Sequence, residues 1–151
     1  MEEKKKSKKK SKANCATRAN ARCPILKDLL LPKDTNANFD IFGGVLMSRL
    51  DIAAALFARG ISPLQKWVTV AVNNIIFKKP VQVGDVFSIY AQQKRIGTSS
   101  LTITLQGEVE RKGEVFEAVS AEYVFVTVNA NHESEPIQVQ PKPSKCRSCA
   151  S

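Results

Sequence analysis

The sequence predicts an α+β fold, in which a curved antiparallel β-sheet wraps around one long buried helix. Two observations carry this prediction. Residues 45–59 are good helix formers and apolar almost all round, which is typical of a helix covered by other structure. The chain after that helix is rich in β-formers, and residues 100–110 alternate strictly between apolar and polar side chains. A sheet that curls around an apolar helix buries both hydrophobic surfaces at once.

The predicted elements follow one another in a simple order. The apolar stretch 24–31 is a short strand, and the polar stretch 32–42 is a turn-rich loop. The helix over 45–59 ends at Gly60, with Pro63 behind it as a second stop signal. Four strands come next, and the alternation in the third indicates a half-buried antiparallel sheet. These strands are expected at 67–77, 86–93, 100–110 and 115–128, with turns at 83–85, Gly97 and Lys112-Gly113.

The net charge of +9 over 151 residues is concentrated near the two ends of the chain. Residues 1–23 hold nine Lys or Arg against two Glu, and residues 135–151 are rich in Pro and Ser. The middle of the chain is close to neutral. We therefore expect one folded domain over 24–134, between a basic disordered tail over 1–23 and a second tail over 135–151. A neutral fold does not favour binding to nucleic acid.

The four cysteines, Cys15, Cys23, Cys146 and Cys149, lie at the edges of the sequence rather than in its body. A secreted disulfide framework would staple the core, so this pattern indicates a reduced, cytoplasmic protein. The spacing of Cys146 and Cys149 suits a metal, but idle tail thiols are the favoured interpretation and no metal site is expected. No apolar run is long enough to span a membrane, and no secretory signal is predicted.

Most familiar catalytic motifs are absent. The single histidine, His132, follows the last predicted strand in a polar segment, which disfavours mechanisms that need a catalytic histidine. The sequence has no P-loop, no G-x-G-x-x-G and no H-E-x-x-H. The search for familiar catalytic sets is therefore mostly negative.

The positive signal lies just before the helix, where Asp40 precedes Gly43 and Gly44. Glycines at a helix N-terminus allow a substrate to approach free amides and the positive end of the helix dipole, which together can hold an oxyanion. A carboxylate beside such a site can deprotonate water. The alternative is purely structural: Asp40 caps the helix and the glycines form a tight turn. The residues alone leave both interpretations open.

Four pieces of sequence together resemble a known family. They are LPKDTNANFDIFGGVLMSRLD (31–51), FKKPV (77–81), VGDV (83–86) and GTSS (97–100). This combination is similar to the hotdog-fold acyl-CoA thioesterases of the bacterial YciA type, which are related to cytosolic acyl-CoA hydrolases. The likeness covers about residues 25–128, which is nearly the whole predicted domain.

The resemblance implies hydrolysis of a fatty acyl-CoA to a free acid and CoA, with no cofactor beyond the CoA of the substrate. It implies that Asp40 is the general base or nucleophile and that the backbone of Gly43 and Gly44 polarises the thioester carbonyl. Asn38 belongs to the same motif and is assigned to the catalytic set. The family builds its site between two protomers, so the resemblance implies a homo-oligomer with a dimer as active unit, commonly a trimer of dimers.

The sequence departs from the family at Phe39, where a glycine usually precedes the aspartate. If the backbone there needs a positive φ, phenylalanine is costly; its ring is a candidate lining of the acyl site. Basic pairs and hydroxyls beside turns are candidates for holding the CoA phosphates. The candidate CoA-binding residues are Lys78, Lys79, Arg95, Gly97, Thr98, Ser99 and Ser100.

Two alternatives remain at this stage. The alternative to the enzyme is a non-enzymatic acyl-CoA-binding regulator, since hotdog domains can sense acyl-CoA, although a sensor has no need of Asp40. Asp51, within the apolar helix, is expected to make a structural hydrogen bond, with a second catalytic carboxylate as the alternative role.

Overall fold

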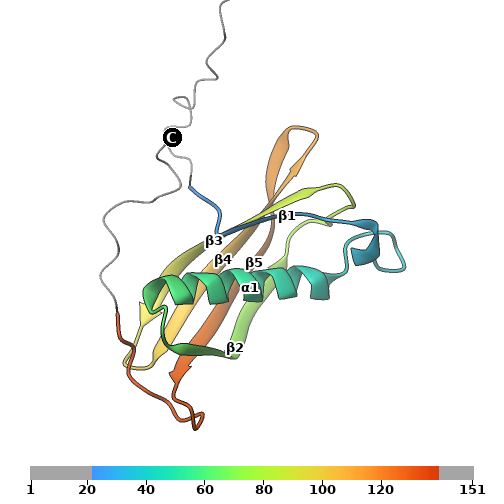
Figure 1. Cartoon of the computed structure of the whole chain (residues 1–151). Helices are drawn as coiled ribbons and strands as arrows, with labels where there is room; N and C mark the ends of the chain where they lie inside the picture. The colour runs from blue at the N-terminus through green and yellow to red at the C-terminus, as the bar shows by residue number, and fades with distance from the viewer. Residues whose placement is uncertain (1–21, 140–151) are drawn as a thin grey trace, which may run out of the picture.

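The computed structural model describes residues 22–139, and the rest of both terminal segments lies outside that range. Five antiparallel strands form one curved sheet, and a single helix packs against one face of it (Figure 1). The predicted fold class is confirmed. The elements are β1 (Leu26–Leu29), a 3-10 turn (Pro32–Asp34), α1 (Gly43–Ile61), β2 (Lys66–Phe77), β3 (Val86–Ile96), β4 (Ser100–Arg111) and β5 (Glu114–Val128).

The strand order in the sheet is β1-β3-β4-β5-β2, so β4 lies at the centre and β1 and β2 form the edges. The alternation read from the sequence of β4 is confirmed, because every second side chain is fully buried under the helix. The turn between β4 and β5 has φ 50° at Lys112 and 85° at Gly113, the pair of positive values that a tight hairpin requires. The buried side chains of β4 are Leu101, Ile103, Leu105 and Val109.

Two elements differ in length from the prediction. Strand β3 continues to Ile96 rather than ending at 93, because pairing with β4 carries it past a bulge between Gln93 and Arg95. Helix α1 includes both glycines at its start and passes through Gly60, where a Cβ would meet nothing within 4 Å. Tertiary pairing and packing override the polar run and the glycine stop signal in these two places.

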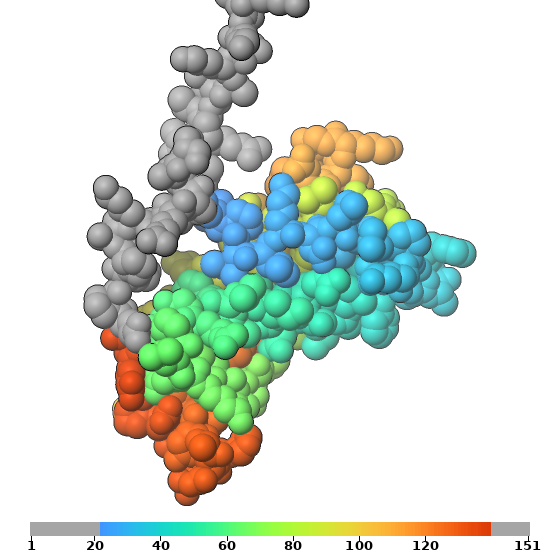
Figure 2. All heavy atoms as spheres, in the orientation of Figure 1, coloured from blue at the N-terminus to red at the C-terminus, as the bar shows by residue number. Residues whose placement is uncertain are grey.

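The helix is buried on one side only within a single chain. Leu50, Ala53 and Ala54 are fully buried against the sheet. On the other side Ile52 and Leu56 are 43% and 47% exposed. Figure 2 shows this outer side of the helix lying across the front of the molecule, uncovered by any other coloured segment. The sheet of the same chain therefore covers only one side of this apolar helix and leaves apolar side chains exposed on the other side.

The folded body continues past residue 134, the predicted end of the domain. The amide of Ile137 donates to the carbonyl of Thr98, and the amide of Gln138 donates to Gln65 Oε1. Within residues 22–139 no helix is long and apolar enough to cross a membrane. Cys23 is exposed, and the predictions for Cys15, Cys146 and Cys149 fall outside the described residues.

Candidate active site

The N-terminus of α1 carries no side-chain cap. Phe42 is the N-cap residue and makes no capping hydrogen bond, so the structural interpretation of Asp40 as the cap is wrong. Gly43 and Gly44 form the first helical turn rather than a tight turn. Their amides lie among the first four of the helix, which have no acceptor inside it. A Cβ on Gly43 would lie 3.3 Å from Phe77 Cζ, which shows how closely the helix start and the end of β2 approach each other.

Asp40 is fixed through its backbone and not through its carboxylate. Its carbonyl accepts a hydrogen bond from the amide of Asn36 at 2.8 Å, and it forms an isolated antiparallel bridge with Gln82. No residue of the described range donates a hydrogen bond to its side chain, which is partly exposed. The chain therefore holds the carboxylate in place without neutralising it.

A cavity of about 300 Å³ opens beside this carboxylate and the helix start. Two of the candidate CoA-binding residues, Lys78 and Lys79, line this cavity and differ in their partners. Lys78 Nζ lies 2.7 Å from Glu117 Oε2, whereas Lys79 Nζ lies over the ring of Phe116, 4.8 Å from its centroid. The lining residues are Asn36, Asp40, Ile41, Gly43, Leu46, Phe77, Lys78, Lys79, Pro80 and Val81.

Phe39 and Asn38 lie outside that lining. Phe39 has φ 63°, so the condition that makes phenylalanine costly in this loop is met. The residue is 82% exposed in the single chain. Asn38 is also exposed, and its amide donates to Asn36 Oδ1 at 2.8 Å. Of the two asparagines, Asn36 faces the cavity and Asn38 shapes the loop.

The second group of predicted CoA-binding residues lies at the opposite end of the helix. The turn from Gly97 to Ser100 joins β3 to β4, and the amide of Gly97 donates to the carbonyl of Ser100 at 2.7 Å. The carbonyls of Thr98 and Ser99 accept from Ile137 and Thr127. Figure 1 shows this hairpin and the loop before α1 at opposite ends of the molecule. Within one chain, Arg95 and residues 97–100 do not reach the cavity beside Asp40.

Asp51 makes the structural hydrogen bond that was expected of it. Its Oδ1 accepts from Thr69 Oγ1 at 2.9 Å, which ties α1 to β2. Nearby, the hydroxyl of Tyr123 donates to the carbonyl of Met47 at 3.0 Å. Burial, with a smaller contribution from the charge of Asp51, raises the pKa of Tyr123 to about 12. This cluster belongs to the packing between helix and sheet, away from the cavity lining.

Asp85 and Arg111 form an ion pair at the turn that follows the cavity-lining residues Pro80 and Val81. Burial alone would raise the pKa of Asp85, but hydrogen bonds from Arg111 and the Gln82 amide, with the charge of Arg111, together hold it below its usual value. The hydrogen bond to Asp85 raises the pKa of Arg111 against the effect of burial, and the charges of Asp85 and Asp40 act in the same direction. Both groups are therefore ionised at neutral pH.

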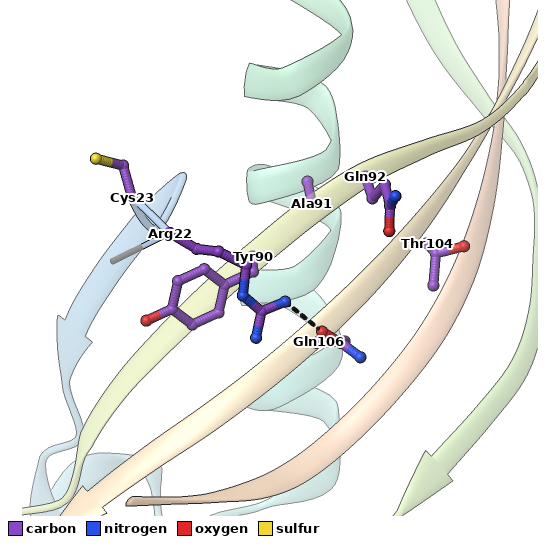
Figure 3. A pocket seen from close by; sticks show the side chains of 7 residues that line it. All are labelled: Arg22, Cys23, Tyr90, Ala91, Gln92, Thr104 and Gln106. Atoms are coloured by element: carbon purple, nitrogen blue, oxygen red, sulfur yellow. Dashed lines mark hydrogen bonds between the residues drawn. The ribbon is translucent and has the colours of Figure 1, made fainter. Parts of the chain in front are cut away.

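A separate polar cavity of about 260 Å³ lies near the N-terminal end of the described chain (Figure 3). Arg22 crosses it, with its guanidinium 4.7 Å from the centroid of the Tyr90 ring and a hydrogen bond of 2.8 Å to Gln106 Oε1. Across residues 22–139 no group of three metal-ligating side chains comes together. His132 lies in an exposed loop beside Lys66.

Sequence reasoning missed three residues at this site. Asn36 lies in the same motif as Asn38, and nothing in the sequence distinguishes which of them faces the cavity. Phe77, at the end of β2, lines the cavity and lies against Gly43. Arg111 is 26 positions from Asp85, and no periodic pattern connects them.

Comparison with known proteins identifies the family to which this chain belongs. The family model described as "Thioesterase superfamily" matches residues 40–116. The acyl-CoA thioester hydrolase YciA of Salmonella typhimurium is 39% identical over 121 residues, which cover 77% of this chain and 90% of that protein. The YciA protein of Escherichia coli K12 is 37% identical over 121 residues, covering 77% and 91%.

Two solved structures extend the likeness to three dimensions. A hexameric thioesterase from Yersinia pestis superposes with a TM-score of 0.73 and 39% identity, covering 76% of this chain and 94% of that one. A hexameric hotdog fold thioesterase of Campylobacter jejuni gives 0.72 and 31%, covering 78% and 91%. The resemblance read from the motifs is confirmed: the chain belongs to the hotdog-fold thioesterase superfamily and, within it, to the family of the YciA acyl-CoA thioester hydrolases.

Proposed function

We propose that this chain hydrolyses acyl-CoA thioesters, with Asp40 as the catalytic carboxylate. The observation that carries the proposal is one juxtaposition. A carboxylate without a hydrogen-bond donor among the described residues lines the same cavity as Gly43, in the uncapped first turn of the helix. Relatives that are named acyl-CoA thioester hydrolases support the choice of substrate class.

The proposed reaction needs only water and groups of the protein. The free amides and the positive end of α1 stabilise the oxyanion that forms when the thioester carbonyl is attacked. Asp40 either removes a proton from the attacking water or attacks the carbonyl itself, giving an anhydride that water then opens. In both routes the C–S bond breaks, CoA leaves as the thiol, and the acid is released. No metal or redox cofactor takes part in this scheme.

We assign CoA phosphate binding at this cavity to Lys79 in preference to Lys78. Glu117 neutralises Lys78 at 2.7 Å, whereas the ammonium group of Lys79 rests on an aromatic ring and is not paired with a carboxylate of the described chain. An ammonium group without an ion pair attracts phosphate more strongly. Phe39 and Asn38, on the exposed loop, are proposed contacts of the acyl-pantetheine part.

The second group, Arg95 with Gly97, Thr98, Ser99 and Ser100, is proposed to serve the site of a neighbouring protomer, because it lies too far from Asp40 of its own chain. We propose a homo-oligomer with the dimer as active unit, assembled as a trimer of dimers, in the cytoplasm. The uncovered apolar side of α1 and the exposed Val70 and Ile76 on edge strand β2 support an assembly. Relatives of known structure are described as hexameric.

The proposal is tested by measuring release of CoA thiol from a panel of short to long acyl-CoAs with wild type, Asp40→Ala and Asp28→Asn. Asp28 is a matched acidic control, because it pairs with Arg49 and does not line the cavity beside Asp40. We expect turnover in wild type and Asp28→Asn and its loss in Asp40→Ala, with the same oligomer by light scattering.

Equal turnover in wild type and Asp40→Ala would remove Asp40 from the mechanism. Tight acyl-CoA binding with no turnover in any variant would contradict the hydrolase and favour the regulator.

A further inference from the structure

One arginine at the end of the central strand clamps the turn that borders the candidate site. Arg111 Nε lies 2.9 Å from Asp85 Oδ1 and Arg111 Nη2 lies 2.6 Å from Asp85 Oδ2, which is a two-pronged contact between guanidinium and carboxylate. The same Nη2 donates to the carbonyl of Pro80 at 3.1 Å. Arg111 therefore holds both ends of the segment 80–85, and paired contacts of this kind fix orientation as well as distance.

The clamped turn is also what holds Asp40. The amide of Ile41 donates to the carbonyl of Val81 at 2.7 Å, and Asp40 itself bridges to Gln82. The amide of Gln82 in turn donates to Asp85 Oδ2 at 2.8 Å. Hydrogen bonds thus run from Arg111 to Asp85 and from Asp85 to the turn backbone, and the turn is bonded in turn to Ile41, the residue next to Asp40.

Burial and charge make this series rigid. The side chain of Asp85 is 3% exposed, so losing its partner would leave a buried charge without compensation. The guanidinium of Arg111 lies 5.3 Å from the centroid of the Phe116 ring, the ring that also carries Lys79. The charge of Arg111 interacts with that of Asp40, and the two-pronged contact fixes Arg111, whereas Lys78 and Lys79 line the same cavity as Asp40.

We propose that Arg111 is a positioning residue for Asp40, acting through Asp85 and the turn 80–85, a role that rests on the proposed hydrolase function. Arg111 need not touch the substrate. Its effect is to keep the carboxylate at the distance and angle that the attack on the thioester requires. A displacement of about 1 Å from that geometry can cost roughly a hundredfold in rate.

The test compares Arg111→Gln, Arg111→Lys and Asp85→Asn with Arg49→Gln, which removes the other Arg–Asp pair, between α1 and β1. We expect kcat to fall about 10- to 100-fold in Arg111→Gln and Asp85→Asn, with KM within about threefold of wild type. Arg111→Lys keeps the positive charge but loses the two-pronged contact with Asp85, so its kcat should lie between those of Arg111→Gln and wild type. Arg49→Gln should keep the wild-type kcat. All are measured at a temperature at which thermal melting shows each variant folded.

A second measurement separates positioning from general stability. In an Asp40→Asn background, Arg111→Gln should leave the residual rate unchanged, since no carboxylate remains to be placed. An equal loss of rate in that background, or an unchanged kcat in folded Arg111→Gln, would overturn the proposal.

Hydrogen exchange of the Ile41 amide tests the clamp without any turnover. We expect the exchange to be about tenfold faster in Arg111→Gln than in Arg49→Gln. An unchanged rate overturns the clamp whether or not the protein hydrolyses acyl-CoA. Absence of CoA release by wild type, with faster exchange in Arg111→Gln, would instead place the failure in the proposed function.

Discussion

The two ends of helix α1 treat their polar groups in opposite ways. At the C-terminal end Ser62 donates to Gln65 Oε1, Trp67 Nε1 donates to the carbonyl of Ser62, and Gln65 Nε2 donates to Glu135 and Pro136. At the N-terminal end the first-turn amides carry no side-chain cap, and none of the described residues donates to the Asp40 carboxylate. One end is closed by hydrogen bonds and the other is left open beside a cavity.

This difference indicates that the N-terminal end of α1 is the less stabilised end and that it lies at the candidate active site. Uncapped amides and an unpaired carboxylate cost free energy that a capping residue would recover. The strained residue of the loop before α1, Phe39 at φ 63°, lies at the same open end. A substitution at the open end should therefore change activity more than stability, and one at the closed end should do the reverse.

The largest expected effect is at the open end. Asp40→Asn removes the base while keeping the size of the side chain, so kcat should fall about 10²- to 10⁴-fold. Its urea midpoint should match wild type, because the structure shows no hydrogen bond to the carboxylate that the amide would break. Stopped assays of CoA thiol and urea titrations on the same samples check both statements. A large loss of stability would contradict the contrast between the ends.

The reverse result is expected at the closed end. Gln65 is buried and makes four hydrogen bonds, so Gln65→Ala should lower the free energy of unfolding by about 2–3 kcal/mol. Its kcat at a temperature at which it is folded should stay within about twofold of wild type. Urea denaturation at fixed protomer concentration gives the first quantity, since assembly contributes to the stability of an oligomer. A loss of rate as large as that of Asp40→Asn would break the comparison.

A smaller effect sharpens the comparison by relieving strain at the open end. Phe39→Gly should raise the free energy of unfolding by about 0.5–1 kcal/mol, because glycine adopts a positive φ without steric cost. Phe42→Gly is the matched control: with φ −62° it gains no such relief and should be destabilised. If Phe39 contacts the acyl-pantetheine part of the substrate, the KM of Phe39→Gly for acyl-CoA should rise, although the variant is more stable than wild type. A less stable Phe39→Gly would show that the ring itself contributes more than its backbone costs.

The smallest effect concerns Asp85, the carboxylate that is paired with Arg111. The pKa of Asp85 is lower in the folded chain than its ordinary 3.8, so its contribution to stability is present above that value. The contribution is lost as the pH falls through the pKa of the folded state. The stability difference between wild type and Asp85→Asn, measured by urea titration from pH 6 down to 2.5, should therefore shrink at the acid end. A difference that does not depend on pH would contradict this assignment.

Most of the fold could be predicted because its pattern is local. The alternation from Leu101 to Val109 fixed which face of β4 is buried, and Lys112-Gly113 marked the following hairpin. The extension of β3 to Ile96 could not be predicted, because Lys94 and Arg95 are polar and the strand continues through pairing with β4.

The candidate site was predictable only in part, for a related reason. Asp40 and the two glycines are neighbours in sequence, so one motif reveals them. Phe77 and Arg111 reach the site from other strands, and their roles depend on contacts between segments far apart in the chain. Which of Asn36 and Asn38 faces the cavity depends on loop dihedral angles that residue types alone do not determine.

The order of strands in the sheet also governs when the molecule can fold during synthesis. Strands β3, β4 and β5 follow one another through tight hairpins, but both edge strands, β1 and β2, precede them in the chain. Strand β2 therefore cannot pair until β5 has been synthesised, since Trp67 of β2 pairs with Thr127 of β5. At translation rates of about 5–20 residues per second, β2 and the apolar helix emerge from the ribosome several seconds before their partners. The N-terminal half is thus the part of the nascent chain that is exposed to aggregation, and the core closes only near the end of synthesis.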